Sequence, residues 1–169
     1  MPVYAAVAFE PLQMLADDLR RRTIALFDEA REEELLWAPP GLSNHVLWHA
    51  GHVVWVLDKL VVEAATSCSL LPPGWAETFG KHCRPPAETT RWPDRAEVRR
   101  ELERQLPRVL EVIGMLTPKT LAGPPCTLQL PHDRPLGYWI THGLHDEASH
   151  QGEMKLLLKM QRAAGRAGR

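Results

Sequence analysis

The chain has 169 residues, of which 44% are hydrophobic, which is enough to bury one core and too little to make a second domain expected. We therefore predict a single domain that spans residues 1–169. The sequence has 20 Lys and Arg residues and 21 Asp and Glu residues, so its formal net charge is -1. A nearly neutral chain has no electrostatic field that would attract nucleic acid or an anionic membrane, and we expect neither as a partner.

The first residues lack the cationic and apolar pattern of a secretory signal, and no stretch reaches the roughly 20 apolar residues of a membrane span. Cys68, Cys83 and Cys126 are odd in number and lie far apart, two of them in Pro-rich segments. This distribution disfavours both a disulfide framework and a clustered thiolate metal site. We expect a soluble, cytoplasmic protein with reduced cysteines.

The first two helices are predicted from apolar periodicity. Apolar residues recur at steps of three and four over residues 9–33, which is typical of one amphipathic helix. Residues 39–41 (PPG) then break the chain. Ser43 or Asn44 can cap the second helix, which we expect to run to about Ala65.

A long Pro- and Gly-rich connection follows over residues 66–93 and contains Trp75, Phe79 and Trp92. A loop of this length inside a compact domain is usually functional or a crossover between distant elements. Its aromatic side chains predict that the connection packs against the rest of the domain.

A third helix is predicted over residues 94–116, with Asp94 as its N-cap. A second Pro-rich link, residues 118–131, precedes a fourth helix, which Pro135 can open and which reaches about residue 162. Four helices, one long crossover and no alternating apolar and polar pattern predict an all-α protein. The expected fold is an antiparallel four-helix bundle with a long crossover between helices 2 and 3.

Six of the eight histidines fall within two of these helices. On the fourth helix, residues spaced by four lie only about 40° apart around the axis and so share a face: His142, Asp146 and His150. On the second helix, spacings of four and three produce another such face: His45, His49 and His52. If these two faces meet, donor groups from remote segments converge in the core, where helical bundles build their metal sites.

The most economical ligand set is His52, Asp146 and His150. Two imidazoles and one carboxylate leave coordination positions open for water or substrate, as in catalytic and not in closed structural centres. We expect one divalent ion, such as Zn, Ni, Fe or Mn. Three further histidines are less favoured candidate ligands: His49, His142 and His145.

The histidines allow two other interpretations. Residues 147–150 read Glu-x-x-His, as in di-iron bundles, but that architecture needs a second such motif, and no other histidine has Glu three residues before it. We set the di-iron interpretation aside. The remaining interpretation needs no metal, because the histidines could bond to one another in the core. His82 and His132 lie in loops, where we expect no special role for them.

Three segments resemble the DinB-like superfamily of four-helix metal proteins: residues 35–41 (LLWAPPG), 47–52 (LWHAGH) and 144–153 (LHDEASHQGE). The resemblance covers most of the chain. It implies one histidine ligand on the second helix, matched by His52, and two on the last helix at a spacing of four, of which His150 matches the second. Asp146 stands at the other position. The third ligand is therefore Asp146, a shifted His145 or His142, or water, and a carboxylate there favours a harder ion.

The resemblance also implies candidate activities, because some members look like S-transferases or isomerases in which a metal activates a low-molecular-weight thiol. Our leading hypothesis is a metal-dependent enzyme, either such a transferase or a hydrolase-like enzyme, that acts on a small electrophile. Its partners would be this small-molecule substrate and the thiol. The alternative is a non-catalytic, metal-binding or stress-associated bundle. We also expect a homodimer formed through exposed helix faces, and we assign no catalytic residue.

Overall fold

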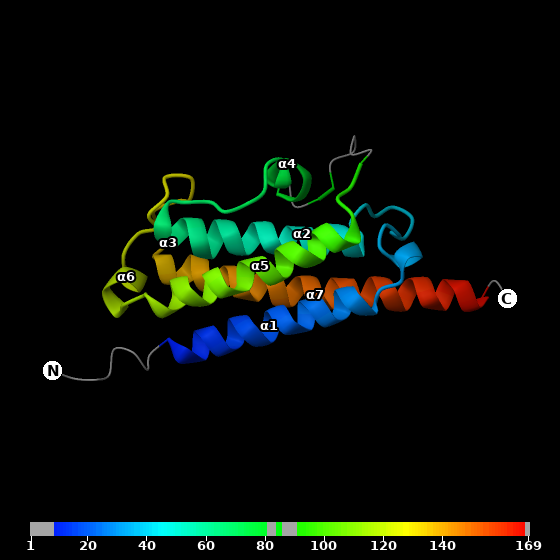
Figure 1. The fold of residues 1–169 in the computed structure, drawn as a ribbon, viewed down its shortest axis with the longest axis horizontal. Coiled ribbons are helices and arrows are strands. Elements are labelled where there is room, and N and C mark those ends of the chain that lie inside the picture. Colours follow the sequence, from blue (N-terminus) through cyan, green and yellow to red (C-terminus); the bar gives the residue numbers. More distant parts are fainter. Residues whose placement is uncertain (1–8, 81–83, 86–90, 168–169) are drawn as a thin grey trace.

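The computed structural model describes residues 9–80, 84–85 and 91–167, and Figure 1 shows their fold. Four long helices lie along a common axis: α1 (Glu10–Glu29), α2 (Val46–Leu57), α5 (Arg95–Gly114) and α7 (Leu136–Ala167). The described ranges contain helices, turns and loops and no strand. The predicted all-α helical bundle is therefore confirmed.

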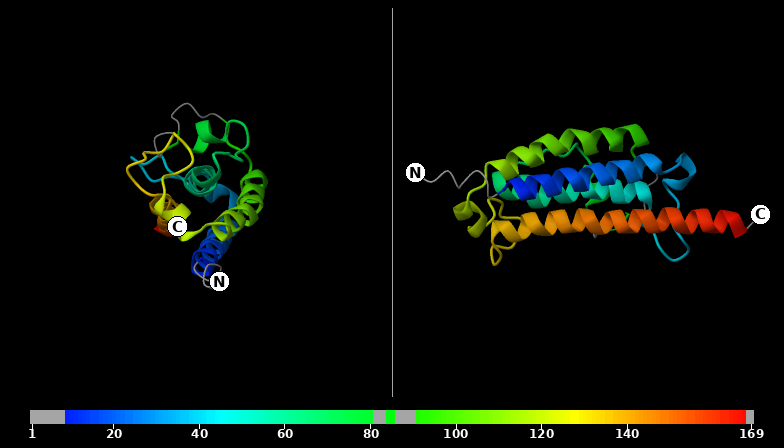
Figure 2. Two further views of the ribbon diagram at one scale, coloured as in Figure 1. Left: turned by 90° about the vertical axis from the view of Figure 1, so that its left-hand side faces the viewer. Right: turned by 90° about the horizontal axis from the view of Figure 1, so that it is seen from below.

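The helix directions follow from the long crossover. α2 and α5 run in one direction, and α1 and α7 run in the other (Figures 1 and 2). α2 packs against the antiparallel α7 and α1 against the antiparallel α5, whereas α1 and α7, like α2 and α5, are parallel neighbours. The segment between α3 and α5 returns the chain to the end of the bundle at which α2 begins. Because of this return, α2 and α5 are parallel, and only helices of different pairs are antiparallel.

The second long helix is less regular than its sequence predicts. α2 passes into a π-helical segment, η3 (Asp58–Glu63), and then into a final turn, α3 (Ala64–Thr66). Just before η3, Gln105 Nε2 donates a hydrogen bond to the carbonyl of Val54 at 2.7 Å. The Val54 carbonyl also accepts from the backbone N–H of Asp58, and a hydrophobic period of three or four residues does not encode the change to π-helical pitch that follows.

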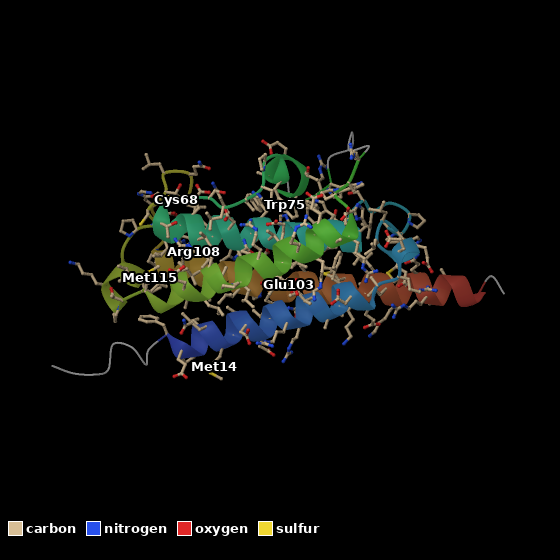
Figure 3. All side chains as sticks on the ribbon, in the orientation of Figure 1. Met14, Cys68, Trp75, Glu103, Arg108 and Met115 are labelled. Atoms are coloured by element: carbon tan, nitrogen blue, oxygen red, sulfur yellow. The ribbon has the colours of Figure 1, made fainter. Side chains whose placement is uncertain are left out.

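The crossover packs against α2, as its aromatic residues predict. It contains a short helix, α4 (Trp75–Phe79), in which Trp75 is 3% exposed and Phe79 is fully buried. Trp75 lies between α4 and α2 (Figure 3), and its Nε1 donates to the carbonyl of Gly51 at 2.9 Å. A Cβ atom on Gly51 would lie 2.2 Å from the Phe79 ring, so this close approach requires glycine.

A buried polar layer separates two apolar clusters along the bundle. Within this layer Arg20 and Glu147 are fully buried, with Arg20 Nε 2.9 Å from Glu147 Oε1. Arg20 also donates to the carbonyl of Leu102 and to Gln105 Oε1, and Thr23 donates to Glu147. These side chains come from α1, α5 and α7, and Gln105 also bonds to the Val54 carbonyl of α2, so the network connects all four long helices.

Two short elements complete the chain: the 3-10 turn η2 (Glu32–Glu34) before α2, and α6 (Pro118–Ala122) before α7. Cys68 and Cys126 are exposed free thiols, whereas Cys83 and His82 lie outside the described residues. None of the helices in the described ranges combines the length and the apolar character that crossing a bilayer requires.

Candidate metal centre

The structure brings together the three side chains of the favoured ligand set. His52 comes from α2, and Asp146 and His150 come from α7. Asp146 Oδ2 lies 3.9 Å from His52 Nε2 and 3.3 Å from His150 Nε2, and all three donor atoms lie within 4.8 Å of one another. The antiparallel contact between α2 and α7 thus produces the convergence that the helical spacing predicts.

The His52 ring is held in one orientation and one tautomer. Its Nδ1 donates a hydrogen bond to the backbone carbonyl of Phe79 in the crossover, and its ring stacks on Trp48 at a centroid distance of 4.5 Å. Burial lowers the pKa of His52 to about 4, against the opposing effect of the Phe79 carbonyl. The ring is therefore neutral at pH 7, and with its proton on Nδ1 it presents a free lone pair at Nε2.

His150 has a comparable outer partner. Its Nδ1 lies 3.0 Å from Glu153 Oε2, which can accept the ring proton and leave Nε2 free to face Asp146. Burial alone would raise the pKa of Asp146, but the proximity of His150 and then of His52 outweighs it and lowers this pKa. Asp146 is therefore an ionised carboxylate beside two imidazole nitrogens.

His49 and Glu153 form a second donor group with His150. His49 Nδ1 lies 2.8 Å from His150 Nδ1 and 3.1 Å from Glu153 Oε2. Burial, followed by the proximity of His150, lowers the pKa of His49. From the sequence, His49 is one of the less favoured candidate ligands, and Glu153 is not among the predicted ligands. The sequence contains a signal for this second group. His49 lies three residues before His52 and Glu153 three residues after His150, and residues three apart on a helix share a face.

The other predicted histidines lie elsewhere. His142 is exposed and stacks on Tyr138 at a centroid distance of 5.8 Å, and His145 is exposed as well. Neither belongs to a donor group in the described residues. In the loop before α7, His132 Nε2 bonds to the carbonyl of Thr127 at 3.0 Å, a local contact consistent with the expected lack of a special role.

His45 caps α2. Its Nδ1 accepts a hydrogen bond from the backbone N–H of Trp48 at 3.1 Å, and its ring meets the edge of Trp92. The prediction that Ser43 or Asn44 caps this helix was therefore wrong, whereas His45 lies close enough to His49 to help lower the pKa of His49. Spacing alone does not reveal which residue precedes the first helical turn.

We expect His45→Asn to make the stability of the metal-free protein less sensitive to acid. Burial lowers the pKa of His45 to about 4, whereas an unfolded histidine titrates near 6.5. Between these pH values the unfolded state binds more protons than the folded state. The free energy of unfolding is therefore highest above about pH 6.5 and decreases as the pH falls through about 4. At about 1.4 kcal/mol per pKa unit, His45 accounts for roughly 3 kcal/mol of this loss.

Urea unfolding with a chelator at about pH 7.5 and about pH 4.5 would measure this difference, because asparagine also caps helices and keeps the fold comparable. Equal losses in the wild-type protein and in His45→Asn would contradict the assignment of His45 to this acid sensitivity.

Glu147, the acidic residue of the Glu-x-x-His pattern, points away from the donor groups. It is fully buried and bonded to Arg20 and Thr23 in the polar layer. A carboxylate held by a buried guanidinium is not free to bind a metal ion. This placement agrees with setting the di-iron interpretation aside.

The side chains of the first donor group fit a divalent cation chemically. His52 and His150 each offer an Nε2 whose ring partner nitrogen has its own acceptor, and Asp146 offers an ionised oxygen. Imidazole suits Zn, Ni and Fe, and a carboxylate also suits Mn. Three protein donors leave positions for water or substrate, so the residues present can hold an open, reactive centre.

The comparisons with known proteins agree with this architecture. The family model of the DinB superfamily matches residues 15–154, a range that includes both donor groups. Among curated proteins, no sequence matches the chain. Since the matched range extends from α1 through most of α7 and covers most of the sequence, the chain belongs to the DinB superfamily.

Proposed function

We propose that the protein is a divalent-metal-dependent enzyme that transfers a low-molecular-weight thiol to a small electrophile. The observation that carries the proposal is the group of His52, Asp146 and His150, two imidazoles and one carboxylate whose donor atoms converge. The chain belongs to a superfamily whose members generally bind metal. A closed set of four protein ligands would instead favour the non-catalytic alternative.

In the proposed reaction, the thiol sulfur bonds to the electrophilic carbon, the leaving group departs with its bonding electron pair, and the thiol proton passes to solvent. A bound divalent cation supplies the lowered pKa that makes the thiol a nucleophile at neutral pH. The chain holds the donor atoms in place: the Phe79 carbonyl orients His52, and Glu153 orients His150. Trp48, fully buried against His52, shields one side of the centre from water.

The crossover supplies a candidate wall for substrate binding. A cavity of about 500 Å³ lies between α4 and the start of α5, and Trp75, Phe79, Arg91 and Trp92 are among its lining residues. None of the metal-ligand candidates lines it. Phe79 connects the two features, because it lines the cavity and its carbonyl bonds to His52.

The experiment that tests the proposal measures bound metal and turnover together. Protein purified without a histidine tag should contain about one divalent ion per chain, because the donors converge only in the folded state. His150→Leu should remove the ion, since both donor groups contain His150. His145→Leu, an exposed change on the same helix, should retain it.

A screen of small thiols against electrophiles should then show a rate that disappears with the ion. A fully loaded protein with no rate above that of the free metal would contradict the enzyme proposal and favour the metal-binding bundle. The homodimer stays a prediction, which sedimentation at several protein concentrations would test.

A further inference from the structure

The two ring nitrogens of His150 face different partners, and each nitrogen faces one histidine and one carboxylate. On one side, Nε2 is near His52 Nε2 and 3.3 Å from Asp146 Oδ2. On the other side, Nδ1 is 2.8 Å from His49 Nδ1 and 3.0 Å from Glu153 Oε2. Both groups take one histidine from α2 and one carboxylate from α7, so they are chemically equivalent donor sets.

Protons alone do not satisfy the second group. Its three donor atoms are mutually 2.8, 3.0 and 3.1 Å apart. If only one of the two rings carries a proton on Nδ1, this proton forms one good hydrogen bond. The two atoms without a proton then face each other with their lone pairs. If both rings carry one, two N–H groups face each other across 2.8 Å. A cation placed among the three atoms removes this conflict, because all three then act as acceptors toward it.

We propose that His49, His150 and Glu153 form a second position for a divalent cation, an alternative to the one at His52, Asp146 and His150. This inference rests on the proposed metal centre and adds a site to it. A neutral imidazole has a single free lone pair, so one ion occupies either position but not both. In each arrangement the carboxylate that does not bind the ion accepts the remaining ring proton of His150: Glu153 in one case, Asp146 in the other.

The two positions differ in their access to solvent. The Glu153 side chain is 56% exposed, whereas the Asp146 side chain is 29% exposed. The first position also has a preorganised ligand, because the Phe79 carbonyl fixes His52. The ion therefore prefers the first position in the wild-type chain and uses the second, outer one during exchange with solvent.

Zinc titration of four apo-proteins tests the second position: the wild type, His52→Leu, His49→Leu and the double variant. His52→Leu should still bind one ion per chain, more weakly. Adding His49→Leu should cost at least about tenfold in affinity in the His52→Leu background and less than about threefold in the wild type. An equal, small effect of His49→Leu in both backgrounds would overturn the proposal.

Ring-nitrogen NMR of ¹⁵N-labelled histidines, with Zn²⁺ bound, reports which atom of His150 carries the ion. The expected result is Nε2 in His49→Leu and Nδ1 in His52→Leu. Binding through Nε2 in both variants would overturn the proposal, as would two ions bound to the wild type. His145→Leu is the matched control and should behave as the wild type does.

These outcomes separate the two proposals. A wild-type chain that binds no zinc refutes the metal centre itself. If the wild-type chain binds zinc and the His52→Leu variant binds none, only the second position is refuted. His49 and Glu153 are then hydrogen-bonding partners around a single site.

Discussion

Arg20→Met is expected to lower the free energy of unfolding by about 3–5 kcal/mol, because it leaves the Glu147 carboxylate buried without its cation. Arg20 and Glu147 are both fully buried, and the ion pair lies in the middle of the bundle. The substitution also removes donors to the Leu102 carbonyl and to Gln105. No solvent reaches these groups to replace the lost hydrogen bonds.

The double variant Arg20→Met/Glu147→Met is the matched control. It removes both charges and fills the site with apolar atoms, and replacements of this kind are often neutral or stabilising relative to a buried ion pair. Urea unfolding of the wild type and the variants would therefore show a large loss for the single change and recovery for the double change. A double variant as unstable as Arg20→Met would show that the network is needed for more than charge compensation.

The same network illustrates what the sequence predicts well and what it does not. Arg20 lies within the amphipathic helix predicted over residues 9–33, where a charged residue is expected on the polar outer face. The side chain is instead fully buried. Its burial depends on Glu147 and Gln105 from two other helices, and such a partnership across helices leaves no periodic trace in either segment.

For the candidate site, a spacing of four predicted that Asp146 and His150 share a face in any packing arrangement. Their convergence with His52 was predicted only on the condition that this face meets the histidine face of the second helix. The prediction was less successful at the ends of the stripes. His142 has the correct spacing, yet at its level of α7 the contact with the second helix is made by Gly143, where an added Cβ would lie 3.2 Å from Leu60. The face that a helix buries changes along its length when neighbouring helices cross it at an angle.

The outer partner of His52 could not be predicted at all. It is the backbone carbonyl of Phe79, and a carbonyl has no sequence signature. Only the path of the crossover brings it to α2, and that path depends on a glycine at position 51, under the Phe79 ring. Gly51 therefore has a role in the site although it offers no side chain.

Gly51→Ala tests this role directly. An alanine Cβ would lie 2.2–2.5 Å from three atoms of the Phe79 ring, so α4 must move away from α2. The shift weakens the bond from Trp75 Nε1 to the residue 51 carbonyl and separates the Phe79 carbonyl from His52 Nδ1. We expect a loss of about 1–3 kcal/mol in unfolding free energy from overpacking. We also expect about 10–100-fold weaker zinc binding, since an outer partner of a ligand histidine is lost.

Gly152→Ala is the control for this substitution, because an added Cβ there has no neighbour within 4 Å. Glycine is a weak helix former, so this change in α7 should raise stability by about 0.5–1 kcal/mol and leave zinc affinity unchanged. Urea unfolding and zinc titration of both variants separate the two effects of the crossover. If Gly51→Ala loses stability but binds zinc as tightly as Gly152→Ala does, then the packing of the crossover on α2 stabilises the fold, and the Phe79 carbonyl does not affect the zinc affinity of His52.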